Sequence, residues 1–236
     1  MPYHCPRQDP YNPNAMNTQN TPEVTAAYDQ VARTYADKYQ DEILRKPKVR
    51  EFLADFVAGV PADGLVCDVG CGPGQVARYV HQHLGRRTAG IDLSPEMVRL
   101  AAELNPTIPF RVADVLQMTE TEVYDALIGL YFIVNFPVAA LDGLFGKLHQ
   151  LLKPGGQLLL SFHLGDDARL RQEDFWDSGK PLDFYFFRVE TVREKLLQNG
   201  FAVQDVRLRD PYVGVEYESR RAYVFARKTG DIRQET

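Results

Sequence analysis

This chain has few cysteines, no excess of positive charge and no long hydrophobic run. Three cysteines in 236 residues are too few for a disulfide framework, so we expect a reducing compartment and a cytoplasmic location. No apolar run approaches the roughly 20 residues that cross a bilayer, and the amino end lacks the apolar core of a signal peptide. The net charge of −5 and the lack of a basic stripe disfavour a nucleic-acid partner. We therefore expect a globular protein that acts off the membrane, as a monomer or homodimer.

Signals for several other chemistries are also missing. Cys67 and Cys71 stand four residues apart, but no second cysteine pair or nearby histidine completes a metal site, so we expect no metal. No G-K-[ST] sequence follows the glycine-rich segment, which excludes a P-loop. Gln75 stands where a dinucleotide-binding G-x-G-x-x-G requires its last glycine, which disfavours an NAD-dependent oxidoreductase.

The most informative segment is the glycine-rich turn after the apolar run at 65–69. The run reads as a buried parallel strand that carries one acid, Asp68. Gly70, Gly72 and Gly74 then allow a tight turn on which a ligand can lie against bare backbone. Helix-like sequence follows from residue 75, and its first N–H groups would point at that ligand. The pattern predicts a nucleotide-type binding turn, and the acid favours a ligand that carries an ammonium or sulfonium.

Residues 68–74 resemble the first motif of the class I S-adenosylmethionine-dependent methyltransferases, small-molecule type. Four further segments match this family in order, namely 88–94, 110–115, 124–131 and the L-K-P-G-G junction with its strand at 151–161. The resemblance covers about residues 65–163. It implies an α/β fold, a Rossmann-like three-layer sandwich. Its seven-stranded sheet would be mostly parallel, with the last strand antiparallel and a helical lid before it.

The resemblance also implies S-adenosylmethionine as cofactor and S-adenosylhomocysteine as product. Asp92 ends the second strand, where an acid can accept hydrogen bonds from ribose hydroxyls. Asp114 matches the acid that faces the adenine amino group, although it could instead cap a turn. Met97 would touch the adenine face or pack in the core. The predicted cofactor-binding residues are Asp68, Gly70, Cys71, Gly72, Gly74, Asp92, Leu93, Met97, Asp114, Val115, Leu130, Tyr131, Tyr28 and Tyr35.

The remaining sequence predicts a single domain with additions around the pocket. Residues 1–20 and 229–236 are expected to be tails, the first of them disordered. Within the domain at 21–228, residues 21–46 form an N-terminal lid and about 164–187 an insertion at the pocket mouth. Tyr28 and Tyr35 fit the lid pattern Y-D-x-x-A-x-x-Y of small-molecule members, whose tyrosines could meet the cofactor carboxylate. Ordinary core packing would explain the same stripe. Helices are predicted at 47–60, 75–84, 141–152 and 189–199, and strands at 201–209 and 222–226.

Methyl transfer is an in-line displacement that requires alignment and, for a protonated acceptor, a base. His163 is the candidate base because it ends the fifth strand, where ligands bind in such sheets. A histidine bonded to backbone is the alternative. Asn135 is a further polar group near Tyr131. The charged residues Glu216, Glu218, Arg220 and Arg221 could orient an acceptor, but we expect a solvated loop there. The aromatic residues at 184–187 would line an apolar pocket or pack as a lid.

The acceptor is the least determined part of the prediction. The segment 130–133 lacks the Asn/Asp-Pro-Pro-aromatic sequence of DNA amino methyltransferases, and no cysteine follows Cys71 to serve as a cytosine C5 nucleophile. Asp166 and Asp167 are the only hint of a metal-assisted mechanism. We predict transfer to a small-molecule metabolite. An RNA or protein acceptor, or a non-methylating protein that binds the cofactor on the same fold, stays open.

Overall fold

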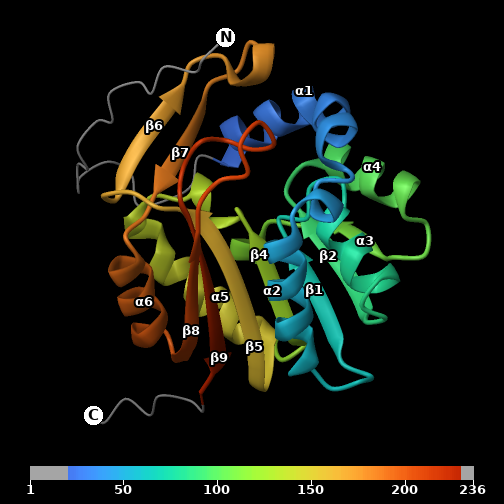
Figure 1. The fold of residues 1–236 in the computed structure, drawn as a ribbon, viewed down its shortest axis with the longest axis vertical. Coiled ribbons are helices and arrows are strands. Elements are labelled where there is room, and N and C mark those ends of the chain that lie inside the picture. Colours follow the sequence, from blue (N-terminus) through green and yellow to red (C-terminus); the bar gives the residue numbers. More distant parts are fainter. Residues whose placement is uncertain (1–20, 230–236) are drawn as a thin grey trace.

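A central sheet covered by helices on both faces forms the body of the protein (Figure 1). The structure is a computed structural model that describes residues 21–229, so the predicted tails fall outside the described residues, apart from Thr229. The strand order is β3-β2-β1-β4-β5-β9-β8, in which β1 to β5 are parallel and β9 is antiparallel to both of its neighbours. The predicted seven-stranded, mostly parallel sheet with an antiparallel last strand is confirmed. Its strands are β1 (Leu65–Val69), β2 (Arg87–Asp92), β3 (Phe110–Val112), β4 (Tyr124–Leu130), β5 (Leu152–His163), β8 (Phe201–Arg209) and β9 (Arg221–Lys228).

The helices follow the apolar periodicity of the sequence. They are α1 (Thr21–Tyr39), α2 (Pro47–Ala58), α3 (Gln75–Gln82), α4 (Pro95–Leu104), α5 (Leu141–Leu151) and α6 (Val189–Gln198). Short 3-10 turns span η1 (Ile43–Arg45), η2 (Val115–Gln117), η3 (Ile133–Asn135), η4 (Val138–Ala140) and η5 (Phe175–Asp177). Ser94 caps the amino end of α4, because its hydroxyl accepts a hydrogen bond from Met97 N at 3.1 Å. No helix among residues 21–229 combines the length and apolarity that a membrane crossing requires.

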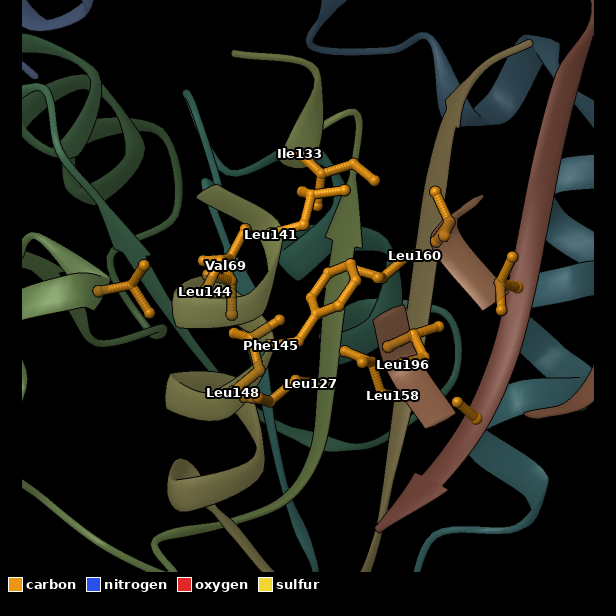
Figure 2. Close-up of a cluster of buried hydrophobic side chains, with 14 of the residues drawn as sticks. Val69, Leu127, Ile133, Leu141, Leu144, Phe145, Leu148, Leu158, Leu160 and Leu196 are labelled. Carbon is orange, nitrogen blue, oxygen red and sulfur yellow. The ribbon is translucent and has the colours of Figure 1, made fainter. Parts of the chain in front are cut away.

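Alternation along the strands divides the core between the two faces of the sheet. Leu158 and Leu160 of β5 pack with α5 and α6, where Phe145 is fully buried (Figure 2). Leu159, between them, points to the opposite face and packs with α2 and α3. The sheet is therefore sealed on both sides, and a ligand can reach it only at its edges or at the strand ends.

One boundary differs from the prediction. We expected a helix over 141–152 that gives way to the fifth strand within the L-K-P-G-G junction, but α5 ends at Leu151 and β5 already begins at Leu152. The reason is pairing: Leu152 already lies opposite Tyr124 in the parallel ladder, and the register shifts between Tyr124 and Ala126 to accommodate the glycines.

A two-stranded hairpin stands at the same end of the sheet as α1 (Figure 1). Its strands, β6 (Ala168–Gln172) and β7 (Leu182–Phe186), occupy the predicted insertion. At the tip of the hairpin, the Trp176 ring stacks on Tyr35 of α1, with centroids 5.5 Å apart. The Phe175 ring packs edge-on against Tyr28, and Glu23 pairs with Arg171 at 2.8 Å. These contacts join α1 and the hairpin into one cover.

Candidate ligand-binding site

A pocket lies beneath this cover, at the carboxyl ends of the parallel strands. It is lined by the residues that follow β1, β2 and β3, by the tip of β4 and by His163 at the end of β5. Parallel strands bring their carboxyl ends to one edge, which is where ligands bind in open α/β sheets. Thirteen of the fourteen predicted cofactor-binding residues line the pocket. The exception is Gly74, which begins α3 with φ 84° and lies against Phe110 and Asn105.

The glycine turn is held by the neighbouring strand. Gly70 N and Cys71 N both donate to the Ile91 carbonyl, at 2.8 and 3.0 Å. Gly70 adopts φ 67°, and a Cβ there would lie 2.6 Å from the Phe132 ring. Only glycine combines this left-handed backbone with so close an approach. The turn therefore presents main chain to the pocket, as the sequence predicts.

Asp92 connects the glycine turn to the start of α4. Its carboxylate accepts hydrogen bonds from Gly72 N at 2.8 Å and from Ser94 N at 2.9 Å. Burial raises the pKa of Asp92, and these backbone donors oppose that shift. Each carboxylate oxygen has a second lone pair, so the group can still accept from a ligand in the pocket.

Asp68 and Gln75 form an acceptor pair close to the same turn. Asp68 is 2% exposed and accepts a hydrogen bond from Ala77 N at 3.0 Å. Burial raises the pKa of Asp68 to about 7, and the charge of Asp92 adds to this shift. The Gln75 side-chain oxygen is buried and has no hydrogen-bond partner within residues 21–229. The unpartnered Gln75 oxygen and the remaining lone pairs of the Asp68 carboxylate fit a ligand that brings a protonated amine.

The other predicted cofactor residues combine local roles with a place in the pocket. Asp114 lines it and also caps η2, accepting from Leu116 N at 2.9 Å, so the turn cap is present and the contact with adenine stays a prediction. Met97 is 1% exposed and packs against α1 while it borders the pocket. The Tyr28 hydroxyl donates to Asn135 Oδ1 at 3.0 Å, which ties the cover to η3.

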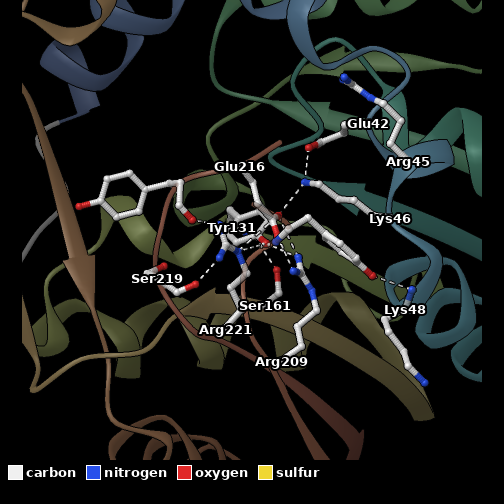
Figure 3. A network of polar contacts seen from close by, with 12 residues as sticks. Glu42, Arg45, Lys46, Lys48, Tyr131, Ser161, Arg209, Glu216, Ser219 and Arg221 are labelled. Atoms are coloured by element: carbon white, nitrogen blue, oxygen red, sulfur yellow. Dashed lines mark hydrogen bonds and ion pairs between the residues drawn. The ribbon is translucent and has the colours of Figure 1, made fainter. Parts of the chain in front are cut away.

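At the other end of the pocket lies a buried set of charges that we call the ionic cluster, consisting of Glu42, Lys46, Arg209, Glu216 and Arg221 (Figure 3). Glu216 is its centre, because its carboxylate binds Arg209 and lies 3.1 Å from Lys46 Nζ. Lys46 also pairs with Glu42. The cluster joins residues from both ends of the chain.

The prediction of a solvated loop at 216–221 is correct for two of its four charged residues. Glu218 and Arg220 are exposed, but the side chains of Glu216 and Arg221 are 5% and 1% exposed. The difference arises from the sheet: β9 enters between β5 and β8 and places Arg221 opposite His163. Glu216 is buried beside Arg221 and carries the opposite charge.

Tyr131 is fixed between the two ends of the pocket. Its backbone has φ 59°, a left-handed conformation that is uncommon for a residue with a side chain. Its N–H bonds to the Ser161 carbonyl at 3.0 Å, and its hydroxyl oxygen accepts from Arg221 Nε at 2.9 Å. These bonds hold the strained residue in place.

His163 stacks against Tyr131, with ring centroids 5.1 Å apart, and its Nδ1 lies 2.6 Å from the Ser219 hydroxyl. Burial and the charge of Arg221 lower the pKa of His163 to about 3. The imidazole is therefore neutral at physiological pH and is a weaker base than a free histidine.

Several residues around the pocket differ from expectation. Asp167, which together with Asp166 could indicate a metal-assisted mechanism, instead accepts hydrogen bonds from Arg188 and Thr191. Within residues 21–229, His, Cys, Asp and Glu side chains nowhere gather in threes to hold a metal. Of the aromatic cluster, Phe184 and Phe186 line the pocket while Phe187 is core. The sequence did not predict a place at this site for four residues that lie in no recognisable motif, namely Glu42, Lys46, Arg209 and Tyr223.

Comparisons with known proteins agree with this geometry. A methyltransferase-domain family model matches residues 66–156. The 2-methyl-6-phytyl-1,4-hydroquinone methyltransferase of Synechocystis is 31% identical over 165 residues, 64% of this chain and 50% of that protein. Phosphoethanolamine N-methyltransferase of Plasmodium falciparum is 26% identical over 140 residues, covering 58% and 53%. The chain thus spans about half the length of these curated relatives.

Solved structures extend the likeness to most of the chain. Magnesium protoporphyrin IX methyltransferase from Synechocystis, crystallised with bound SAM, aligns with TM-score 0.65 and 22% identity over 93% of this chain and all of that one. A SAM-dependent methyltransferase from Methanosarcina mazei aligns with TM-score 0.68 and 15% identity over 76% and 98%. The methyltransferase-domain model thus matches the central segment 66–156, and the chain shares the fold of the methyltransferase structures that it resembles.

Proposed function

We propose that this protein is a methyltransferase that binds S-adenosylmethionine and transfers its methyl group to a small-molecule acceptor. The observation that carries the proposal is the meeting of Asp68, Asp92 and Asp114 around a bare glycine turn in one covered pocket. The relatives that support a small acceptor are named for hydroquinone and phosphoethanolamine substrates. An RNA or protein acceptor has no such support.

Three groups of the cofactor have a fitting partner in the proposal. Asp68 and the unpartnered Gln75 oxygen would bind its ammonium, Asp92 its ribose hydroxyls and Asp114 its adenine amino group. When bound, the cofactor supplies a methyl group that its sulfonium already activates. The protein then needs to orient the acceptor and exclude water, and α1 with the hairpin provides that cover.

Cofactor affinity should fall as the pH is lowered through about 7. The pKa of Asp68 is raised to about 7, and an ammonium ligand prefers the ionised carboxylate. Binding therefore releases a proton, and below that pH affinity falls by up to about tenfold per pH unit. Calorimetric titration with S-adenosylhomocysteine across the neutral range measures the slope. Asp68→Asn should bind weakly with a flat profile, and a wild-type slope in that variant would exclude Asp68 as the titrating group.

His163→Gln should lower turnover only modestly, by less than about tenfold, with S-adenosylhomocysteine affinity unchanged. A general base typically contributes about 10²–10⁴-fold and works best with a pKa near the operating pH, whereas burial holds the pKa of His163 at about 3. His83→Gln, an exposed substitution of the same kind, serves as the control. A loss of two orders of magnitude in turnover with intact binding would establish His163 as a full general base.

A cofactor-binding protein without methyl transfer remains the second candidate, because a [4+2]-cyclase shares this fold with TM-score 0.59. The deciding experiment incubates the protein with S-adenosylmethionine and a metabolite library and follows methylated products by mass spectrometry. Products that appear with S-adenosylhomocysteine in equal amount support transfer. Cofactor binding without any such product would favour the second candidate.

A further inference from the structure

The end of the pocket around Arg221 lies several strands away from the glycine turn along the same edge of the sheet. Arg221 begins β9, and two strands, β4 and β5, lie between β9 and β1. Neighbouring strands are about 4.8 Å apart, so the backbone of Arg221 lies roughly 14 Å from that of the turn. Arg221 nevertheless lines the same pocket, where it contacts Tyr131. A ligand group bound by Arg221 itself would therefore lie about three strand spacings from the turn along this edge of the sheet.

The ionic cluster carries more positive than negative charge. Its three cations, Lys46, Arg209 and Arg221, face two carboxylates, Glu42 and Glu216, and all five side chains are less than a tenth exposed. One net positive charge therefore remains in the interior. An unpaired buried charge is costly, and one anionic group from a ligand would offset it.

Within residues 21–229, some N–H donors at this end of the pocket have no hydrogen-bond acceptor, whereas both carboxylates already accept hydrogen bonds. Glu216 accepts from Arg209, Lys46 and Tyr212 N, and Glu42 accepts from Lys46 and Gln75. Lys46 uses two of its three N–H groups. Arg221 donates to the Tyr131 hydroxyl and to the carbonyls of residues 217 and 219, which leaves two of its five N–H groups.

Two tyrosine hydroxyls add a further donor. The oxygens of Tyr131 and Tyr223 both accept from Arg209, and they lie 3.4 Å from each other. Their single mutual contact can use only one of the two phenolic hydrogens. Within residues 21–229, the other hydrogen has no acceptor, and both residues line the pocket. An oxygen of a bound ligand would accept a hydrogen bond from this second phenolic hydrogen.

The walls around these donors are apolar and aromatic. Phe184 and Phe186 of the hairpin line the pocket from one side, and Phe132 and Phe136 line it after β4. Such walls favour a planar or otherwise apolar ligand body. The single net charge and the planar edge of a guanidinium fit a carboxylate, which carries one charge and two coplanar oxygens.

We infer that the methyl acceptor carries one carboxylate on an apolar body, and that Arg221, with Lys46 and the Tyr131–Tyr223 pair, binds this carboxylate. The inference rests on the proposed function, because it names the acceptor class of the same pocket. The carboxylate of the cofactor is the competing source of the same chemistry. The position of Arg221, three strand spacings from the glycine turn, favours the acceptor, whereas Lys46 pairs with Glu42, which also bonds to Gln75 beside the turn. The experiment on Arg221 separates the two sources.

The test compares acids with their neutral amides on the S-adenosylhomocysteine-loaded protein. Benzoate, phenylacetate and 3-phenylpropionate are titrated beside their primary amides by calorimetry. In the wild-type protein, at least one acid should bind about tenfold or more tightly than its amide. Arg221→Gln should reduce this ratio to about twofold or less and leave S-adenosylhomocysteine affinity within about threefold of the wild type. Arg227→Gln, at the exposed end of the same strand, should keep the wild-type ratio.

The outcomes distinguish this inference from the proposed function. Normal S-adenosylhomocysteine binding with no preference for any acid overturns the inference alone. A loss of S-adenosylhomocysteine affinity in Arg221→Gln, with the acid preference retained, assigns the guanidinium to the cofactor carboxylate and also overturns it. Failure of the wild-type protein to bind S-adenosylhomocysteine removes the proposed function, and the acid preference is then measured without it. If Arg221→Gln does not fold, Lys46→Gln tests the same charge, and the wild-type comparison needs no variant.

Discussion

Asp92→Ala should lower the affinity for S-adenosylhomocysteine by about 100-fold or more. In the proposed complex, Asp92 accepts two hydrogen bonds from the ribose, and a hydrogen bond to a charged group contributes about 1.5–3 kcal/mol. The substitution also removes the acceptor of Gly72 N, so the turn beneath the ligand loses its tie to α4. Isothermal titration calorimetry measures the affinity directly.

The control for Asp92→Ala is Glu103→Ala on the exposed side of α4. Glu103 pairs with Arg33 and Arg99 at the surface, and surface pairs of this kind contribute little. This variant should bind S-adenosylhomocysteine like the wild type, and both variants should keep a cooperative thermal melt. If Asp92→Ala binds normally, the ribose site has been assigned to the wrong carboxylate.

Glu216→Gln should destabilise the fold by about 3–5 kcal/mol, the cost of leaving buried cations without their partner. Glu216 binds Arg209 and lies close to Lys46 and Arg221, so the amide would face three positive charges. Denaturant unfolding measures the loss. Glu218→Gln, two residues away and exposed, should change stability by no more than about 0.5 kcal/mol.

The same substitution should alter the acid sensitivity of the fold. Burial opposes ionisation, yet the hydrogen bonds from Arg209 and the charge of Lys46 lower the pKa of Glu216 to about 2. A carboxyl whose folded pKa lies below its unfolded value of about 4.3 contributes stability above that value. This contribution is lost as the pH falls toward 2, so the gap between wild type and variant should narrow below about pH 4. A gap that stays constant over this range would show that the charge of Glu216 does not matter.

The side of the pocket at the glycine turn, where we propose that the cofactor binds, could be predicted from sequence because its signals are local. The strand, the glycine turn and the helix that follows are contiguous, and Asp92 stands at a strand tip that hydrophobic pattern alone can place. A lid at 21–46 and an insertion at about 164–187 were expected as segments, but the hairpin within the insertion was not. Their stacking through Trp176 and Tyr35 was not expected either, because it joins residues that are distant in the chain.

The ionic cluster could not be predicted for a related reason. Lys46 precedes α2 and Glu216 precedes β9, and each alone resembles an ordinary surface charge. Only the sheet order, which inserts β9 beside β5, brings them to 3.1 Å. The left-handed backbone of Tyr131 likewise depends on partners from β5 and β9.

The antiparallel direction of β9 has a consequence for how this protein could change over evolution. Because β9 runs against its neighbours, its first residue arrives at the edge where β4 and β5 finish. Apart from Glu216, which pairs with three buried cations, the exposed positions of the segment 210–220 can therefore vary at this edge without altering the glycine turn. Under the proposed function, substitutions at these positions would change the choice of acceptor while the contiguous segment 65–75 keeps its place beneath the cofactor.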